Sequence, residues 1–103
     1  MIGIDIVQIS RVVLHDSFIH MILTPEELVE FSAKTSETAQ KEYLAGRFAV
    51  KEAIFKATQD HDYLHYSCLN TPSGKPAIKD HPEIEVSISH DGGIAAAIVQ
   101  IHG

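Results

Sequence analysis

The segment 44–57, LAGRFAVKEAIFKA, is apolar on almost every side when it is drawn as a helix with about 100° between successive residues. Leu44 and Phe48 lie on one side, Val50 and Ile54 lie on another, and alanines point in a third direction. A helix of this kind is buried in a core or covered at an interface. The other elements of the chain are therefore expected to pack around it.

Four charged residues interrupt this apolar helix: Arg47, Lys51, Glu52 and Lys56. Arg47 and Lys51 are spaced i,i+4, as are Glu52 and Lys56, so each pair shares one side of the helix. The simplest interpretation is a surface ion pair between Glu52 and Lys56, worth about 0.2–0.5 kcal/mol. A carboxylate beside so much apolar surface nevertheless needs a partner, because an unpaired buried charge is costly.

Residues 2–9, IGIDIVQI, alternate with a period of two and are rich in β-branched side chains, which predicts a strand. Asp5 lies on the face opposite the isoleucines. Asp5 and Glu52, brought together from a strand and a helix, would suit Mg²⁺, which commonly takes one or two protein carboxylates and completes its shell with water and phosphate oxygens. The cations of the helix could then contact those phosphates.

The remaining patterns predict three helical segments and further strands. We expect a helix over 11–22, a second one that begins after Thr24 with Pro25 and Glu27 in capping positions, and a third from about Ser36 or Thr38 to about Thr58. Later segments predict a strand at YSCLN, a turn at TPSGKP, and a hairpin of IEVSISH and IAAAIVQI around DGG. This order predicts an α+β fold with a small antiparallel sheet and helices packed on one face.

The bulk numbers restrict the class of protein. The 103 residues suit one domain, 1–103, and 8 basic against 14 acidic residues give a net charge of −6. This charge argues against broad nucleic-acid binding, but a local cluster of cations could still bind a small anion. No apolar run approaches the roughly 20 residues of a membrane span. A single cysteine excludes a disulfide framework, and the start of the chain lacks the features of a secretory signal, so we expect a cytoplasmic protein.

Four motifs of the chain, in this order, resemble those of one enzyme family. The motifs are GIDIVQISRV, LAGRFAVKEAIFKA, SGKP and VSISHDGGIAAAIV. With them, the chain over residues 2–101 resembles holo-[acyl-carrier-protein] synthase, the small single-repeat branch of the 4′-phosphopantetheinyl transferases. The resemblance implies a 4′-phosphopantetheinyl transferase-like fold. It also implies transfer of 4′-phosphopantetheine from coenzyme A to a serine of apo acyl carrier protein, with release of adenosine 3′,5′-bisphosphate, in fatty acid and lipid biosynthesis.

The resemblance also implies roles for the charged residues. Asp5 and Glu52 would hold Mg²⁺, which also binds the pyrophosphate of coenzyme A. Lys56 matches the helix lysine that lies beside this pyrophosphate, and Arg47 and Lys51 fit further phosphate contacts. Such roles agree with the chemistry, because transfer of this type depends mostly on positioning and charge neutralisation.

The histidine and the turn of the last two motifs complete the implied site. His90 would lie beside a coenzyme A phosphate or the attacking hydroxyl and counts with Asp5, Glu52 and Lys56 as a catalytic residue; without its motif, a histidine at a hairpin end would be expected to have no role. Gly74, Lys75 and Pro76 would bind the nucleotide end of coenzyme A, although an ordinary turn explains SGKP equally well. The general base stays open between Glu52, Lys56, His90 and a metal-bound water.

The family resemblance implies two kinds of partner. Arg11 matches the first of several arginines that dock the acidic carrier protein, but the following stretch, VVLHDSFIHM, contains only histidines as further cations. The small branch forms homotrimers with sites between subunits, so we expect the same here. The alternatives are a non-enzymatic sensor domain that binds coenzyme A or another nucleotide, and an interaction domain whose charges form only ion pairs.

Overall fold

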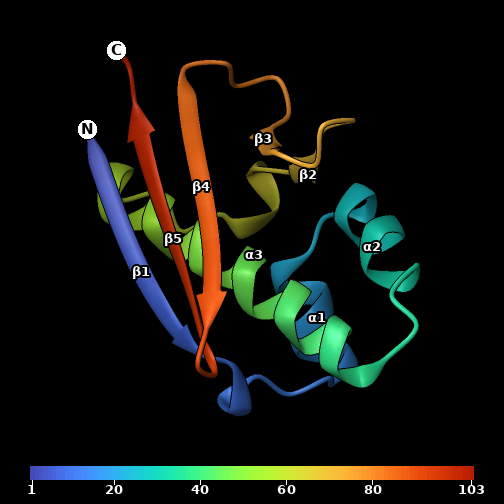
Figure 1. The fold of residues 1–103 in the computed structure, drawn as a ribbon. Helices are drawn as coiled ribbons and strands as arrows, with labels where there is room; N and C mark the ends of the chain where they lie inside the picture. The colour runs from blue at the N-terminus through green and yellow to red at the C-terminus, as the bar shows by residue number, and fades with distance from the viewer.

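A three-stranded antiparallel sheet and one long helix form the centre of the molecule in this computed structural model, which describes residues 1–103 (Figure 1). The sheet has the order β1-β5-β4, with β1 at Ile2–Gln8, β4 at Ile84–Asp91 and β5 at Ile94–Ile101. Helix α3, Glu37–Thr58, crosses one face of the sheet and contacts all three strands. The α+β prediction is therefore confirmed, and β4 and β5 form the expected hairpin.

Two short helices and a small second sheet surround α3. Helix α1 spans Asp16–Ile22 and α2 spans Pro25–Ser32, while β2, Cys68–Asn70, pairs with β3, Pro76–Ile78. Two 3-10 turns connect these elements, at Ile9–Arg11 and Tyr63–His65. None of the helices combines the length and the apolar character that a membrane span requires.

The helix starts follow their capping residues. Thr24 and Glu27 form a complete capping box at the start of α2, with Thr24 N donating to Glu27 Oε1 at 2.9 Å. Ser36 caps α3, which ends at Thr58 as expected. The prediction of a helix over 11–22 is wrong for its first part, because Val12 is extended and buried after the 3-10 turn and α1 begins only at Asp16. Two adjacent β-branched residues, Val12 and Val13, also disfavour helix there.

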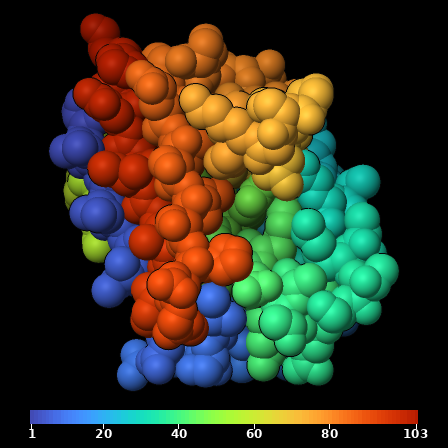
Figure 2. Space-filling model, in the orientation of Figure 1, coloured from blue at the N-terminus to red at the C-terminus, as the bar shows by residue number.

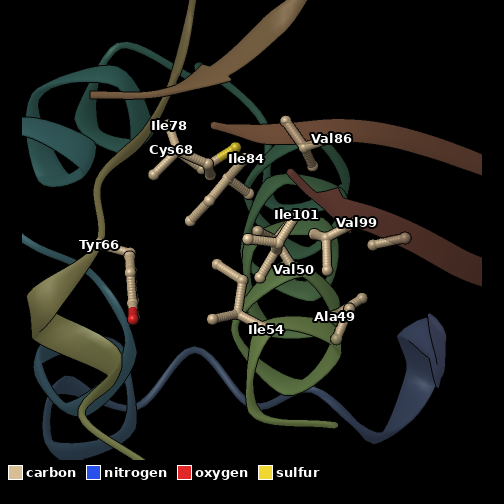
Figure 3. Close-up of a cluster of buried hydrophobic side chains, with 12 residues drawn as sticks. Ala49, Val50, Ile54, Tyr66, Cys68, Ile78, Ile84, Val86, Val99 and Ile101 are labelled. Carbon is tan, nitrogen blue, oxygen red and sulfur yellow. The ribbon is translucent and has the colours of Figure 1, made fainter. Parts of the chain in front are cut away.

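The core lies between α3 and the inner face of the sheet. Figure 3 shows Val50 and Ile54 of α3 directed at Val99 and Ile101 of β5. A second buried cluster joins α1 and α2 to the first half of α3. The apolar sides of segment 44–57 are therefore buried within one chain, because the sheet covers one side of α3 and the two short helices cover another.

Small residues allow α3 and the sheet to approach each other closely. Ala49 and Ala53 of α3 and Ala97 of β5 are buried at this contact. Opposite them on β1, a Cβ atom added to Gly3 would lie 1.9 Å from the carbonyl oxygen of Ala53. Only glycine fits this position, and the contact fixes β1 against α3 two residues before Asp5.

The outer face of the sheet is uncovered and is apolar along β1 and the adjacent part of β5, whereas β4 presents the polar Glu85, Ser87 and Ser89. Ile2, Ile4, Ile6 and Ile98 are between 40% and 66% exposed. Ile4 and Ile98 are direct cross-strand partners, so the exposed side chains are adjacent. The alternation expected in residues 2–9 is present, and Asp5 lies on the side that faces α3.

Candidate active site

Asp5, in the middle of β1, and Glu52 of α3 lie beside the same cavity along the contact between these two elements. Both side chains line a cavity of about 400 Å³, together with Arg11 at the end of the first 3-10 turn. Asp5 points to this side because alternate residues of β1 face α3, and Glu52 lies on the side of α3 next to β1. Two carboxylates that are far apart in the sequence thus share one cavity.

Lys56 neutralises the strand carboxylate. Its Nζ lies 2.9 Å from Asp5 Oδ1 and donates a second hydrogen bond to the carbonyl oxygen of Ile4 at 3.1 Å. The lysine side chain is half exposed, whereas that of Asp5 is only 16% exposed. The simple i,i+4 ion pair between Glu52 and Lys56 does not form, because Lys56 bonds to β1 instead.

Glu52 accepts a hydrogen bond from the hydroxyl of Tyr63. The Tyr63 ring rests edge-on against Phe48, with ring centroids 6.2 Å apart, so the tyrosine packs across the side of α3. Burial, and next the bond to the Glu52 carboxylate, raise the pKa of Tyr63 to about 12. The phenol therefore remains a hydrogen-bond donor across the physiological pH range.

Lys51 does not reach the cavity, and the expectation that it contacts phosphate is wrong. Its side chain is fully buried, and Nζ lies 2.9 Å from Glu27 Oε1, whose side chain is also fully buried. The same ammonium donates to the carbonyl oxygens of Ile22, Tyr63 and Tyr66 at 2.8–3.0 Å. Burial lowers the pKa of Lys51, and Glu27 opposes this effect. Lys51 is a structural cation because every contact of its ammonium lies inside the protein.

The donor set of the first cavity fits Mg²⁺. A hard cation of this kind takes one or two carboxylates and keeps several sites for water and substrate oxygens. Asp5 and Glu52 supply the two carboxylates, and the cavity leaves room for the other ligands. No group of three or more histidine, cysteine or acidic side chains gathers anywhere in the chain, so the protein would offer such an ion these two carboxylates and no third ligand of this kind.

A second cavity, of about 290 Å³, lies on the other side of α3 and collects most of the residues expected to bind coenzyme A. Arg47, Gly74, Pro76 and His90 all line it. Figure 2 shows this region as a hollow, with α3 in green at its base between β4 in orange, the turn before β3 in yellow and α2 in teal. The two cavities share no lining residue.

Arg47 is the cation at the base of this second cavity. Its guanidinium donates to Cys68 O at 2.9 Å and to Asn70 Oδ1 at 3.0 Å, and it lies 3.2 Å from Glu30 Oε1. It also stacks on the ring of Tyr43 at 4.3 Å. These contacts fix the side chain, and the charge of Arg47 is already partly neutralised by Glu30.

The remaining predicted residues lie at the rims of the cavities. His90 is exposed at the end of β4, with Nδ1 3.4 Å from Glu42 Oε2. Gly74 has a φ of +89°, which a turn residue without a side chain adopts readily. Lys75 is exposed beside Pro76 and lines an adjoining cavity of about 340 Å³. The SGKP motif is thus both a turn between two strands and part of a cavity wall.

The sequence alone does not identify three residues that contact the predicted site residues. Glu27 is recognisable as a capping residue but not as the partner of Lys51, and Glu42 is one of several acidic residues on α3. Tyr63 lies in an irregular segment with no periodic pattern, so nothing local connects it to Glu52. The only sequence signal for Tyr63 is indirect: a carboxylate in apolar surroundings, such as that of Glu52, requires a hydrogen-bond or ion-pair partner.

This chain is similar to known proteins over nearly its whole length. The model of the 4′-phosphopantetheinyl transferase superfamily matches residues 1–99. A holo-[acyl-carrier-protein] synthase of Mycoplasma mycoides subsp. mycoides is 38% identical, with 94% of this chain and 89% of the relative covered.

Two solved structures are also similar. The holo-(acyl-carrier-protein) synthase of Bacillus anthracis in complex with CoA (3′,5′-ADP) has a TM-score of 0.83 and 34% identity, covering 95% of this chain and 91% of that one. The Helicobacter pylori holo-[acyl-carrier-protein] synthase in complex with coenzyme A has a TM-score of 0.81 and 32% identity, covering 99% and 100%. Since the family model and these relatives span nearly the whole chain, this protein belongs to the 4′-phosphopantetheinyl transferase superfamily.

Proposed function

We propose that this protein transfers 4′-phosphopantetheine from coenzyme A to a serine of apo acyl carrier protein and releases adenosine 3′,5′-bisphosphate. The observation that carries the proposal is the meeting of Asp5 and Glu52 in one cavity, with Lys56 bonded to Asp5. The relatives named as holo-[acyl-carrier-protein] synthases support it, as do the complexes with coenzyme A and CoA (3′,5′-ADP).

The first cavity would serve the pyrophosphate. Asp5 and Glu52 would hold Mg²⁺, which when bound would neutralise the phosphate charge and act as a Lewis acid. Lys56 lines a neighbouring cavity of about 450 Å³ rather than this one, but its ammonium is bonded to Asp5 at 2.9 Å, and its half-exposed side chain would turn toward a phosphate oxygen from there. Its role would be to stabilise the negative charge that develops on the leaving bisphosphate.

The second cavity would take the nucleotide part of coenzyme A. The turn of Gly74, Lys75 and Pro76 offers an exposed cation and backbone groups, and Arg47 offers a fixed guanidinium at the base. We assign His90 a contact with a coenzyme A phosphate or with the attacking hydroxyl. In either role the imidazole would have the Glu42 carboxylate beside it, since Nδ1 lies 3.4 Å from Glu42 Oε2.

The separation of the two cavities supports an active site between subunits. Within one chain, Asp5 and His90 line different cavities, and a homotrimer could bring one cavity of each subunit against the other cavity of its neighbour. The uncovered isoleucine face of β1 supplies apolar surface for such an assembly. We therefore propose a homotrimer with interfacial sites.

A charge on the isoleucine face tests the assembly. Ile4→Glu is expected to convert the trimer to monomers in size-exclusion chromatography with light scattering. Val29→Glu is the matched control, because Val29 is 73% exposed on α2, away from the sheet. A wild-type protein that is monomeric at high concentration would contradict the proposal.

We also propose that Arg11 docks the carrier protein and that the protein acts in the cytoplasm. Arg11 is exposed and lines the same cavity as Asp5 and Glu52, so a carrier protein docked on it would present its serine near the proposed metal. The cytoplasm is the compartment that we propose, since the apo carrier protein and coenzyme A would be met there.

Mass spectrometry of an apo carrier protein incubated with this protein, coenzyme A and Mg²⁺ tests the activity directly. A mass gain of one phosphopantetheine is the expected result, and Glu52→Gln is expected to abolish it while the fold survives. Glu37→Gln on the exposed start of α3 is the control and keeps the activity. Metal-independent binding of coenzyme A without any product would instead favour a sensor domain.

A further inference from the structure

We infer that Tyr63 is a positioning residue for Glu52, and that it fixes the orientation of this carboxylate toward the first cavity. The inference rests on the proposed function, since it concerns the metal that Glu52 would hold. It adds a residue from the second 3-10 turn, which none of the four sequence motifs contains.

The hydrogen bond from Tyr63 acts on the least constrained part of Glu52. Only Oε1 of Glu52 has a hydrogen-bond partner in the protein, and this partner is the Tyr63 hydroxyl. The last torsion of a glutamate side chain has a broad energy minimum, so a carboxylate without a partner rotates easily. A bond to one oxygen selects one rotation and leaves the other oxygen, Oε2, as the free ligand.

Tyr63 can position Glu52 because it is itself held at three points. Its ring packs edge-on against Phe48, and its carbonyl oxygen accepts from Lys51 Nζ at 2.8 Å. The 3-10 turn that carries it is capped by Asp62, whose Oδ1 accepts from Leu64 N at 3.2 Å.

The buried ion pair extends this support into the core. Lys51 is one residue before Glu52 on α3, and Glu27 fixes its ammonium from α2. The same ammonium also holds the carbonyl oxygen of Tyr66, so both ends of the segment 63–66 are anchored to α3. Glu52 and the residue that orients it are thus fixed to one rigid element. Groups that orient a metal ligand in this way typically contribute 10-fold to 100-fold in metal affinity or activity.

Tyr63→Phe tests the inference, because it removes the hydroxyl and keeps the ring and the carbonyl oxygen. Tyr66→Phe is the matched control: its hydroxyl donates to Asp60 Oδ2 at 2.9 Å, so the variant loses the same kind of bond in the same segment, away from Glu52. Binding of Mn²⁺ to the full chain is measured from the signal of free Mn²⁺ in electron paramagnetic resonance. We expect Tyr63→Phe to weaken Mn²⁺ binding about 10-fold or more, and Tyr66→Phe to leave it unchanged.

A kinetic measurement separates positioning from general damage. Tyr63→Phe should raise the Mg²⁺ concentration for half-maximal transfer and leave the KM for coenzyme A unchanged. Mn²⁺ affinity that is equal to that of the wild type, or tighter, would overturn the inference and leave the proposed function standing. If the wild type binds no Mn²⁺ and Glu52→Gln retains transfer, the metal site itself is refuted, and the inference with it.

Discussion

The buried pair of Lys51 and Glu27 predicts that Lys51→Met destabilises the protein far more than an ordinary lysine substitution. Methionine fills a similar volume, so the change removes the charge and the donors with little loss of packing. It leaves the Glu27 carboxylate in the core without its cation, and it removes a donor from three carbonyl oxygens, two of them buried.

The magnitude follows from the burial of both partners. Removing one member of a buried ion pair costs about 3–5 kcal/mol, because the remaining charge is uncompensated. A domain of this size has about 5–15 kcal/mol of total stability, so the variant loses a large part of it. Near the melting temperature each kcal/mol corresponds to about 4–8 °C, which gives a decrease of at least about 12 °C in Tm.

Urea denaturation at one fixed protein concentration measures this effect, since assembly would otherwise contribute. Lys41→Met is the matched control, because Lys41 lies on the same helix and pairs only with the exposed Glu37 at 3.6 Å. Its expected cost is below about 0.5 kcal/mol. Adding Glu27→Gln to Lys51→Met should recover part of the loss, because the isolated charge disappears. A loss below about 1 kcal/mol for Lys51→Met would refute the reasoning.

Three further predictions concern the fold and its ionisable groups. Gly3→Ala should lower the free energy of unfolding by about 3 kcal/mol or more and reduce transfer, because the added Cβ would lie 1.9 Å from Ala53 O. In Gly46→Ala the added Cβ meets only a side-chain atom at 3.3 Å, so this control variant should be tolerated. Urea denaturation of both variants measures the difference. Three hydrogen-bond donors lower the pKa of Asp60 to about 2 from 3.8, so its stabilisation is present above pH 4 and is lost as the pH falls toward 2; Asp60→Asn should flatten that part of the stability curve. Burial raises the pKa of all three tyrosines, so the native protein should show little tyrosinate absorbance at 295 nm at pH 10.5. The unfolded chain ionises its tyrosines near pH 10, before the native protein does, so the free energy of unfolding should fall as the pH rises from 10 toward 12.

Much of the fold could be predicted because local rules agree with the tertiary structure. The capping residues Thr24 and Ser36 mark the true starts of two helices, and the alternation of IEVSISH and IAAAIVQI marks a true hairpin. The rule of helical periodicity fails before Asp16, where the burial of Val12 decides the conformation. Local patterns also do not reveal that β2 and β3 form a separate sheet, since pairing depends on contacts distant in sequence.

The site shows a similar limit. Asp5 and Glu52 could be connected because both are carboxylates in apolar surroundings and both lie in motifs. The charge of Lys51 and its place in the motif predict a contact with phosphate, yet its side chain points to Glu27 of α2. Lys51 and Glu52 are adjacent in α3, but the first has a structural role and the second lines the site. Tyr63 could not be found, because its link to Glu52 exists only after the segment 63–66 has packed on α3.

The close contact of α3 with the sheet gives the core residues an evolutionary constraint. Ala53 and Gly3 separate the two elements by no more than hydrogen and methyl groups, and Asp5 and Glu52 project from the same two elements. In most proteins, substitutions that place larger side chains in the core can be accommodated by small shifts of the helices. Here such a shift would change the distance between the two carboxylates. Selection on catalysis would therefore act on the size of alanines that never touch a substrate.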